Sequence, residues 1–260
     1  MQSLLFLGTG PGTPVAARFC SSCLVQSGEA RILVDAGEPC SQRLVAAGVS
    51  AADLDAVLIT HGHSDHIGGF PMLVQSAWLA PRERPLPVWL PRELISPLRA
   101  WLDAVYLPSS LLGFPLELNA WNIEETVSPA PGIEVGVFPT THLQGLHRKI
   151  DPSSTGRFEI FGLDMNCQGR RVVFSSDLGA PSDLESSLSA PCDVLVCELS
   201  HFRPEELFTL LRGRTIGRLV FNHLAPELNG REHELLEAAR EALPQIDEVT
   251  AVRDGDRIEF

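Results

Sequence analysis

Residues 59–69 read Ile-Thr-His-Gly-His-Ser-Asp-His-Ile-Gly-Gly and continue an apolar run. His61, His63, Asp65 and His66 thus fall within six positions of a chain that has eight histidines in all. The apolar run predicts a buried strand, and side chains two residues apart point the same way on extended backbone. Imidazoles and carboxylates at this density suit zinc, iron or manganese, so the stretch predicts a metal site at the tip of a strand.

Three further residues of the same chemical type end apolar runs elsewhere in the chain: His142, Asp177 and His223. One cluster cannot complete a site for two metals, so ligands from other strand ends are needed. A layered fold gathers the loops that follow its strands, and we expect these three side chains to meet the first cluster there.

Apolar runs and turn signals give a coarse order of elements. Strands are predicted at 4–7, 22–26, 31–34, 56–60, 86–90, 133–138, 158–163, 171–175, 194–198, 218–222, 248–253 and 257–260. Helices are predicted at 41–47, 70–79, 91–107, 183–187, 204–211 and 232–242, with Pro97 as an interruption. Strands followed by helices, twice over, indicate an α+β fold: a four-layer αββα sandwich formed by one domain, residues 1–260.

Composition bounds the function. The formal net charge is −13, with 33 acidic against 20 basic residues, whereas a broad nucleic-acid footprint needs a basic face. The six cysteines lack the spacing of a disulfide framework, and we find no signal peptide or membrane span. We therefore expect a cytoplasmic, reduced protein with no membrane partner.

The H-x-H-x-D-H motif with single His, Asp and His residues at later strand ends resembles the metallo-β-lactamase superfamily. The match runs from Leu7-Gly-Thr-Gly10 through residues 32–37 to Asp254-Gly255. The resemblance implies the αββα fold and two divalent metals, zinc before manganese or iron. Its implied ligands are His61, His63 and His142 for the first metal, Asp65, His66 and His223 for the second, and Asp177 between them with a bridging water or hydroxide.

Two carboxylates near this set have supporting roles to be tested. Asp65 could also orient the nucleophile or accept its proton. Asp35, two residues before Gly37, has two interpretations: it supports a ligand from beneath, or it only forms a turn.

The opening Leu4-Leu-Phe-Leu-Gly-Thr-Gly-Pro-Gly-Thr-Pro14 narrows the branch. Its glycines do not form a dinucleotide-binding fingerprint, because prolines intervene and no helix follows. The stretch resembles the opening of the ribonuclease Z-like branch, which includes PhnP-type cyclic phosphodiesterases. Within that resemblance, His201 would contact a phosphate or protonate a leaving group, oriented by Glu198. The alternative is that His201 is a surface residue that caps a helix.

The stretch 142–150 follows a metal-ligand candidate and contains Arg148 and Lys149, the latter the only lysine of the chain. In so acidic a chain, clustered cations beside the site could select an anionic substrate. A solvated loop without such a role is the alternative.

The usual ribonuclease Z carries a basic, glycine-rich arm that grips transfer RNA, and we find none. Segment 91–113 is apolar instead, and it could be a lid, the face of a homodimer or a cover for the sheet. We therefore expect a dinuclear metal-dependent hydrolase that cleaves small or cyclic phosphodiesters. Alternatives are transfer-RNA 3′ processing, lactone or thioester hydrolysis and, with least support, a metal-binding protein without catalysis.

Overall fold

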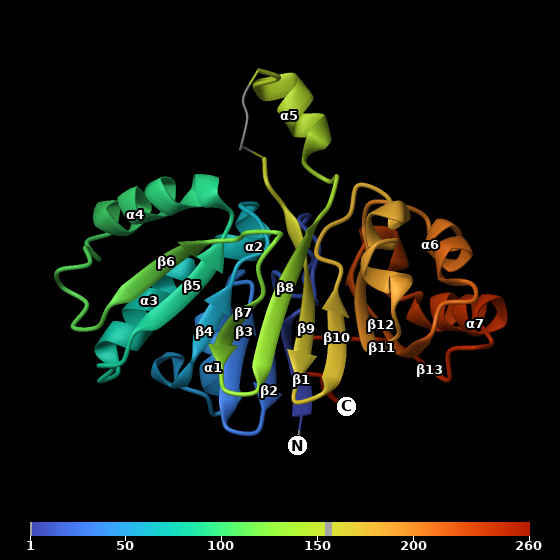
Figure 1. Cartoon of the computed structure of the whole chain (residues 1–260), viewed down its shortest axis with the longest axis horizontal. Helices are drawn as coiled ribbons and strands as arrows, with labels where there is room; N and C mark the ends of the chain where they lie inside the picture. Colours follow the sequence, from blue (N-terminus) through green and yellow to red (C-terminus); the bar gives the residue numbers. More distant parts are fainter. Residues whose placement is uncertain (1, 154–157) are drawn as a thin grey trace.

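The computed structural model describes residues 2–153 and 158–260, and it has two seven-stranded sheets that face each other (Figure 1). Across the first sheet the strands are β14 (Arg257–Glu259), β1 (Gln2–Gly8), β2 (Ser22–Ser27), β3 (Ala30–Val34), β4 (Ala56–Leu58), β5 (Leu86–Leu90) and β6 (Leu116–Ala120). Across the second they are β13 (Glu248–Ala251), β12 (Ile216–Leu224), β11 (Cys192–Leu199), β10 (Arg170–Phe174), β9 (Phe161–Cys167), β8 (Ile133–Pro139) and β7 (Val127–Ala130).

Each sheet is antiparallel on one side and parallel on the other. In the first sheet β14, β1, β2 and β3 pair antiparallel, and β3 to β6 pair parallel. In the second sheet β7 to β10 pair antiparallel, and β10 to β13 pair parallel. Parallel neighbours need crossover connections, which is where most of the helices lie.

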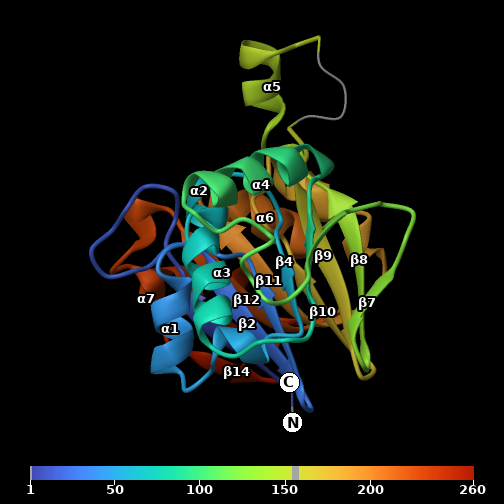
Figure 2. The same cartoon turned by 90° about the vertical axis from the view of Figure 1, so that its left-hand side faces the viewer.

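Apart from α5, the helices lie along the outer faces and the upper edge of the two sheets (Figures 1 and 2). They are α1 (Cys40–Ala46), α2 (Ser64–Ile67), α3 (Phe70–Leu79), α4 (Ile95–Ala104), α5 (Gln144–Ile150), α6 (Pro204–Leu211) and α7 (Glu232–Ala242). Short 3₁₀ helices occupy Ala51–Asp53, Arg92–Leu94, Pro181–Leu184, Ser187–Ser189 and Pro226–Leu228. None of the helices in the described ranges has both the length and the apolar character needed to cross a membrane.

Three apolar clusters separate four layers, as expected for an αββα sandwich. Along β1, Leu4 and Phe6 belong to the cluster between the sheets, whereas Leu5 and Leu7 face α1 and α3. Val220 of β12 joins the same central cluster, while its neighbours on the strand pack against α6 and α7. Strict alternation along strands buried on both faces thus builds the layers.

Several element bounds differ from expectation. Pro97 does not interrupt a helix: it lies in the first turn of α4, where its missing N–H has no partner to lose. In place of the expected helix 183–187, the chain has two 3₁₀ helices, Pro181–Leu184 and Ser187–Ser189, which overlap its two ends. The strand expected from residue 158 begins at Phe161. Strands β6 and β7 were not expected, because β6 alternates weakly and β7 contains a proline.

The largest departure is α5, which occupies a stretch expected to be a loop. This helix follows His142, in the connection between β8 and β9. It projects away from the sandwich (Figures 1 and 2). Most of its residues are exposed. The chain therefore carries a short projecting element beside the metal-ligand candidates.

Candidate metal centre

The loop after β4 places four of the candidate ligands. The backbone N–H of Ile59 donates to Trp89 of β5, and the indole N–H of Trp121 donates to the carbonyl of Ile59, at 2.8 and 2.9 Å. His63 is the N-cap of α2, whose first turn carries Asp65 and His66. The loop is thus anchored to the sheet immediately before its ligands.

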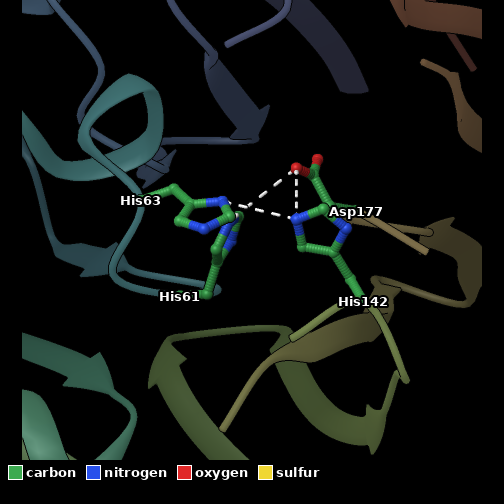
Figure 3. A group of neighbouring side chains, drawn as sticks. All are labelled: His61, His63, His142 and Asp177. Carbon is green, nitrogen blue, oxygen red and sulfur yellow. Dashed lines mark hydrogen bonds and ion pairs between the residues drawn. The ribbon is translucent and has the colours of Figure 1, made fainter. Parts of the chain in front are cut away.

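The remaining candidates come from the second sheet. His142 follows β8, Asp177 follows β10, and His223 lies near the end of β12, where the chain has a positive φ of 49°. The structure brings all seven candidates together in two groups whose donor atoms lie within 4.8 Å of one another. One group is His61, His63, His142 and Asp177, drawn in Figure 3, and the other is Asp65, His66 and His223.

Asp177 lies between the two groups. Its Oδ2 is 3.7 Å from Nε2 of both His61 and His142. Its Oδ1 is 3.3 Å from Nε2 of His66 and 3.6 Å from Nε2 of His223. One oxygen therefore faces each group, the arrangement that a carboxylate shared by two cations requires.

The donor atoms fit a pair of divalent cations. Nε2 of His61, Nε2 of His66 and Oδ1 of Asp177 are buried and have no hydrogen-bond partner among the described residues. Buried polar atoms normally have hydrogen-bond partners. Unpaired nitrogen and oxygen atoms that converge on one point therefore indicate that a cation belongs there. Histidine nitrogens with carboxylate oxygens are the donors that zinc binds, and manganese and iron accept them as well.

The electrostatics differ between the two groups. Against the lowering effect of burial, Asp177 and Asp35 raise the pKa of His66, and Asp177 and Asp65 raise that of His223. In the first group the pKa values of His61 and His142 are lowered. Burial, and the histidines nearby, lower the pKa of His61 well below its ordinary value. The pKa of His142 falls to about 4, mainly because the ring is buried. Both imidazoles are therefore neutral at physiological pH, the form that binds a metal.

Asp35 supports the ligands from beneath rather than merely forming a turn. Its Oδ2 lies 2.7 Å from Nδ1 of His66, which leaves Nε2 of that ring free to bind a cation. Its Oδ1 accepts from the backbone N–H of Thr60 at 2.8 Å, and the Thr60 hydroxyl lies 3.0 Å from Nδ1 of His61. Thr60 was not singled out from the sequence, although it adjoins the motif.

A second supporting carboxylate, Asp183, also escaped the sequence reasoning. Its Oδ2 accepts from the backbone N–H groups of Thr141 and Gly179, both at 2.9 Å. These two residues adjoin the loops that carry His142 and Asp177. Asp183 lies in the 3₁₀ turn Pro181–Leu184, and only the fold brings it near both loops.

The glycine loop after β1 also reaches the centre. A Cβ atom at Gly12 would lie 3.3 Å from Oδ2 of Asp65. The absence of a side chain at Gly12 thus allows the loop to pass close to a ligand.

Glu198 and His201 form a pair at the edge of the ligand set. Nδ1 of His201 lies 2.7 Å from Oε1 of Glu198, and the His201 ring is centred 4.2 Å from that of His142. The Glu198 carboxylate is buried and accepts from the backbone N–H groups of Leu178 and Ser200, both at 2.7 Å. Burial alone would lower the pKa of His201, but Glu198 and Asp177 outweigh it, so the pKa is raised and the imidazolium is favoured.

Arg148 and Lys149 are exposed on α5, apart from the ligand set in the body of the sandwich. If these two side chains contact the substrate, as the sequence suggested, they do so from the projecting helix α5 and not from among the candidate ligands.

Comparison with known proteins places the chain in a family. A family model described as the beta-lactamase superfamily domain matches residues 30–246. The ribonuclease Z of Pseudomonas putida strain KT2440 is 34% identical over 232 residues, which cover 83% of this chain and 70% of that protein. The chain belongs to the metallo-β-lactamase superfamily.

Solved structures of superfamily members share the fold. The metallo-beta-lactamase fold protein YhfI from Bacillus subtilis superposes with a TM-score of 0.79 at 20% identity, covering 100% of this chain and 99% of that one. A diphosphatase from the PhnP family superposes with a TM-score of 0.71 at 18% identity, covering 100% and 98%. At these identities the solved structures show the fold alone. Membership of the superfamily identifies the chain as a metal-dependent hydrolase.

Proposed function

We propose that this chain hydrolyses phosphodiesters at a dinuclear metal centre, with small or cyclic diesters as its substrates. The observation that carries the proposal is the His201–Glu198 pair, which places an imidazole with a buried carboxylate partner beside the two ligand groups. Two divalent cations, when bound, would supply a water of lowered pKa and polarise a phosphoryl oxygen. Zinc is the metal we propose first, on the chemistry of the donor set.

Each residue near the ligands then has a role of its own. His61, His63 and His142 would hold one cation, Asp65, His66 and His223 the other, and Asp177 would be shared. Asp65 would also orient the attacking water or accept its proton.

His201 suits a role at the leaving group, across the phosphate from the attacking water. A diester carries one negative charge, which an imidazolium attracts, and cleavage leaves an alkoxide that needs a proton. Nδ1 of His201 lies 2.7 Å from Oε1 of Glu198, so Nε2 remains and, when protonated, would contact the phosphate or protonate the leaving oxygen. Glu198 acts as a positioning residue, since its three hydrogen-bond partners fix its carboxylate.

The test uses bis-p-nitrophenyl phosphate and the purified full chain. We expect about two metals per chain and release of p-nitrophenol that chelation abolishes and zinc or manganese restores. Metal-loaded protein that cleaves lactones or thioesters but no phosphodiester would overturn the proposal and leave the fold untouched.

Transfer-RNA 3′ processing is the second candidate. The relative from Pseudomonas putida is named a ribonuclease Z, and Arg148 and Lys149 lie on a helix that projects beside the centre. Against it stand the net charge of −13 and the shortness of α5, seven residues. Precursor transfer RNA incubated at low salt separates the two: accurate 3′ cleavage at a kcat/KM well above that for the small diester would favour the RNA substrate.

A further inference from the structure

A small polar cavity lies beneath the metal centre, between the ends of strands from both sheets. Its volume is about 40 Å³, and its lining includes the candidate ligands His66, Asp177 and His223. Ser176 and Asn222 add polar side chains from the second sheet. One ordered water needs about 10–15 Å³ of such a volume, so the cavity has room for about three water molecules.

The far side of the His223 ring distinguishes this candidate ligand from two of its neighbours. Nδ1 of His66 lies 2.7 Å from Oδ2 of Asp35, and Nδ1 of His61 lies 3.0 Å from the Thr60 hydroxyl. Nε2 of His223 faces the centre, but its Nδ1 is buried and has no hydrogen-bond partner among the described residues. A histidine that binds a metal almost always donates its other N–H to an acceptor, so this nitrogen needs one.

Two further unpaired atoms belong to residues that line the same cavity. Oδ1 of Asn222 and Oγ of Ser176 are buried, and neither has a hydrogen-bond partner within residues 2–153 and 158–260. An imidazole N–H donates and an amide oxygen accepts, but Nδ1 of His223 and Oδ1 of Asn222 do not meet directly. A water molecule can accept from the first and donate to the second, and buried waters make about three such bonds.

The backbone around the cavity is shaped by an irregularity in β12. Asn222 pairs with Glu198 of β11, but the next residue of β11 pairs with Leu224. His223 is therefore an extra residue, a β-bulge, and bulges change the direction in which a side chain points. His223 has a φ of 49° and Ser176 a φ of 54°, a left-handed conformation that costs energy in residues other than glycine. Strain of this kind is concentrated at functional sites, which supports a role for both residues.

We propose that the cavity holds ordered water that accepts the Nδ1–H of His223 and donates to Oδ1 of Asn222, with the Ser176 hydroxyl as a further partner. Asn222 is then a positioning residue. Through the water it fixes the tautomer and the orientation of the His223 ring, and so keeps Nε2 available for a cation. The inference rests on the dinuclear centre of the proposed function and not on which ester is cleaved.

The experiment measures the two stepwise affinities of the full chain for zinc, by competition with a chromophoric chelator. For Asn222→Val we expect one affinity to fall about 10- to 100-fold, the usual effect of losing such a partner, and the other to stay unchanged. Valine suits a strand, so the sandwich should still form. Asn222→Asp keeps an oxygen acceptor and should bind both zinc ions about as tightly as the wild type.

Ser27→Ala is the matched control for Ser176→Ala. Both hydroxyl oxygens are buried and unpaired among the described residues, but Ser27 ends β2 and does not line the cavity. Ser27→Ala should change neither affinity, whereas Ser176→Ala should weaken the same one as Asn222→Val. A crystal structure of the zinc-loaded chain should show a water within about 3.2 Å of Nδ1 of His223.

The outcomes separate this inference from the proposed function. If the wild type binds two zinc ions and Asn222→Val binds both as tightly, the water bridge is overturned and the proposed function stands. An equal loss of both affinities in Asn222→Val, or a zinc-loaded crystal without water at Nδ1 of His223, would overturn the bridge as well. A wild type that binds fewer than two zinc ions would instead overturn the dinuclear centre and the proposed function with it.

Discussion

His201 differs from the seven candidate ligands in its exposure and in its hydrogen-bond partner. Its side chain is 31% exposed, and its one close acidic partner, Glu198, is almost fully buried. The candidate ligand histidines lie around Asp177, and the His201 ring lies at the edge of this set, 4.2 Å from that of His142 and 5.9 Å from that of His223. Asp177, Glu198 and His201 also bring donor atoms within 4.8 Å of one another, so metal content has to be measured alongside activity. This placement suits a group that handles the substrate rather than the metal.

Replacing this residue should separate chemistry from metal binding. For His201→Asn we expect kcat with a small cyclic phosphodiester, whose leaving group is an alkoxide, to fall about 10²- to 10³-fold, because a general acid in the transition state is lost. Metal content, measured by plasma mass spectrometry, should remain at about two per chain.

His233→Asn provides the control, since His233 lies on α7 with its side chain 83% exposed. It should leave both kcat and metal content unchanged. A His201→Asn variant that loses metal in parallel with activity would show that His201 is a ligand and not an acid.

Helix α5 raises a different question, because it carries exposed cations on an element that projects from the body. His147 stacks on Phe158 at 5.2 Å between ring centroids, which fixes one side of the helix to the returning chain. Arg148 and Lys149 are left facing outward. The helix thus presents positive charge on a chain whose net charge is −13.

Removing this charge should weaken the capture of anionic substrates. For the double variant Arg148→Ala, Lys149→Ala we expect KM for a phosphodiester to rise a few-fold at low salt with little change in kcat. The difference from wild type should shrink as salt approaches about 0.5 M, because exposed charges are screened.

Arg212→Ala, an exposed arginine at the far end of α6, should show no such effect. Equal KM values for the double variant and the wild type at low salt would leave α5 without a role in binding.

The elements that the sequence predicted well are those with a strong local pattern. The bounds of α3 and α6 match expectation because proline and glycine mark their starts and apolar spacing fills them. Helix α5 has no comparable signal: its residues pack against little, so no apolar stripe records it. Strand β6 is an edge strand whose residues are mostly half-buried, and alternation is weak there.

The candidate ligands could be predicted because their chemistry is unusual and their positions at strand ends are local facts. The role of Asp183 could not be predicted. Asp183 accepts hydrogen bonds from Thr141 and Gly179, which are 42 and 4 residues away in the sequence, and only the fold brings these two loops together. The pocket between the ligand loop and α4, which has Trp101 in its lining, could not be predicted either. The sequence showed an apolar helix but not that a glycine of the metal loop would leave room beside it.

At the level of the molecule, the metal centre joins the two sheets. Four of its candidate ligands follow β4 of the first sheet, and three come from strands of the second. Burial alone would raise the pKa of Asp177, but the surrounding histidines hold it well below its ordinary value, so this carboxylate is ionised inside the core. Cations bound here should therefore stabilise the whole sandwich.

Chelation should accordingly lower the melting temperature. At metal concentrations about a thousandfold above Kd, binding adds about 4 kcal/mol, which corresponds to a shift of about 10 °C for a chain of this size. We expect that loss in calorimetry after treatment with a chelator, and recovery when zinc is added back. An unchanged melting temperature in protein shown to be free of metal would contradict the role of the centre as a link between sheets.

The position of α4 has a consequence for how such a chain can diversify. The segment between β5 and β6 carries Trp101 and Leu94 but none of the seven candidate ligands, and β6 is the outermost strand of its sheet. Length and composition can therefore vary there without shifting the register of any strand that ends in a ligand. Mutation and recombination in this segment should therefore leave the candidate ligands in place, so residues 91–115 are the part of this chain in which a library can be varied most freely while hydrolysis is retained.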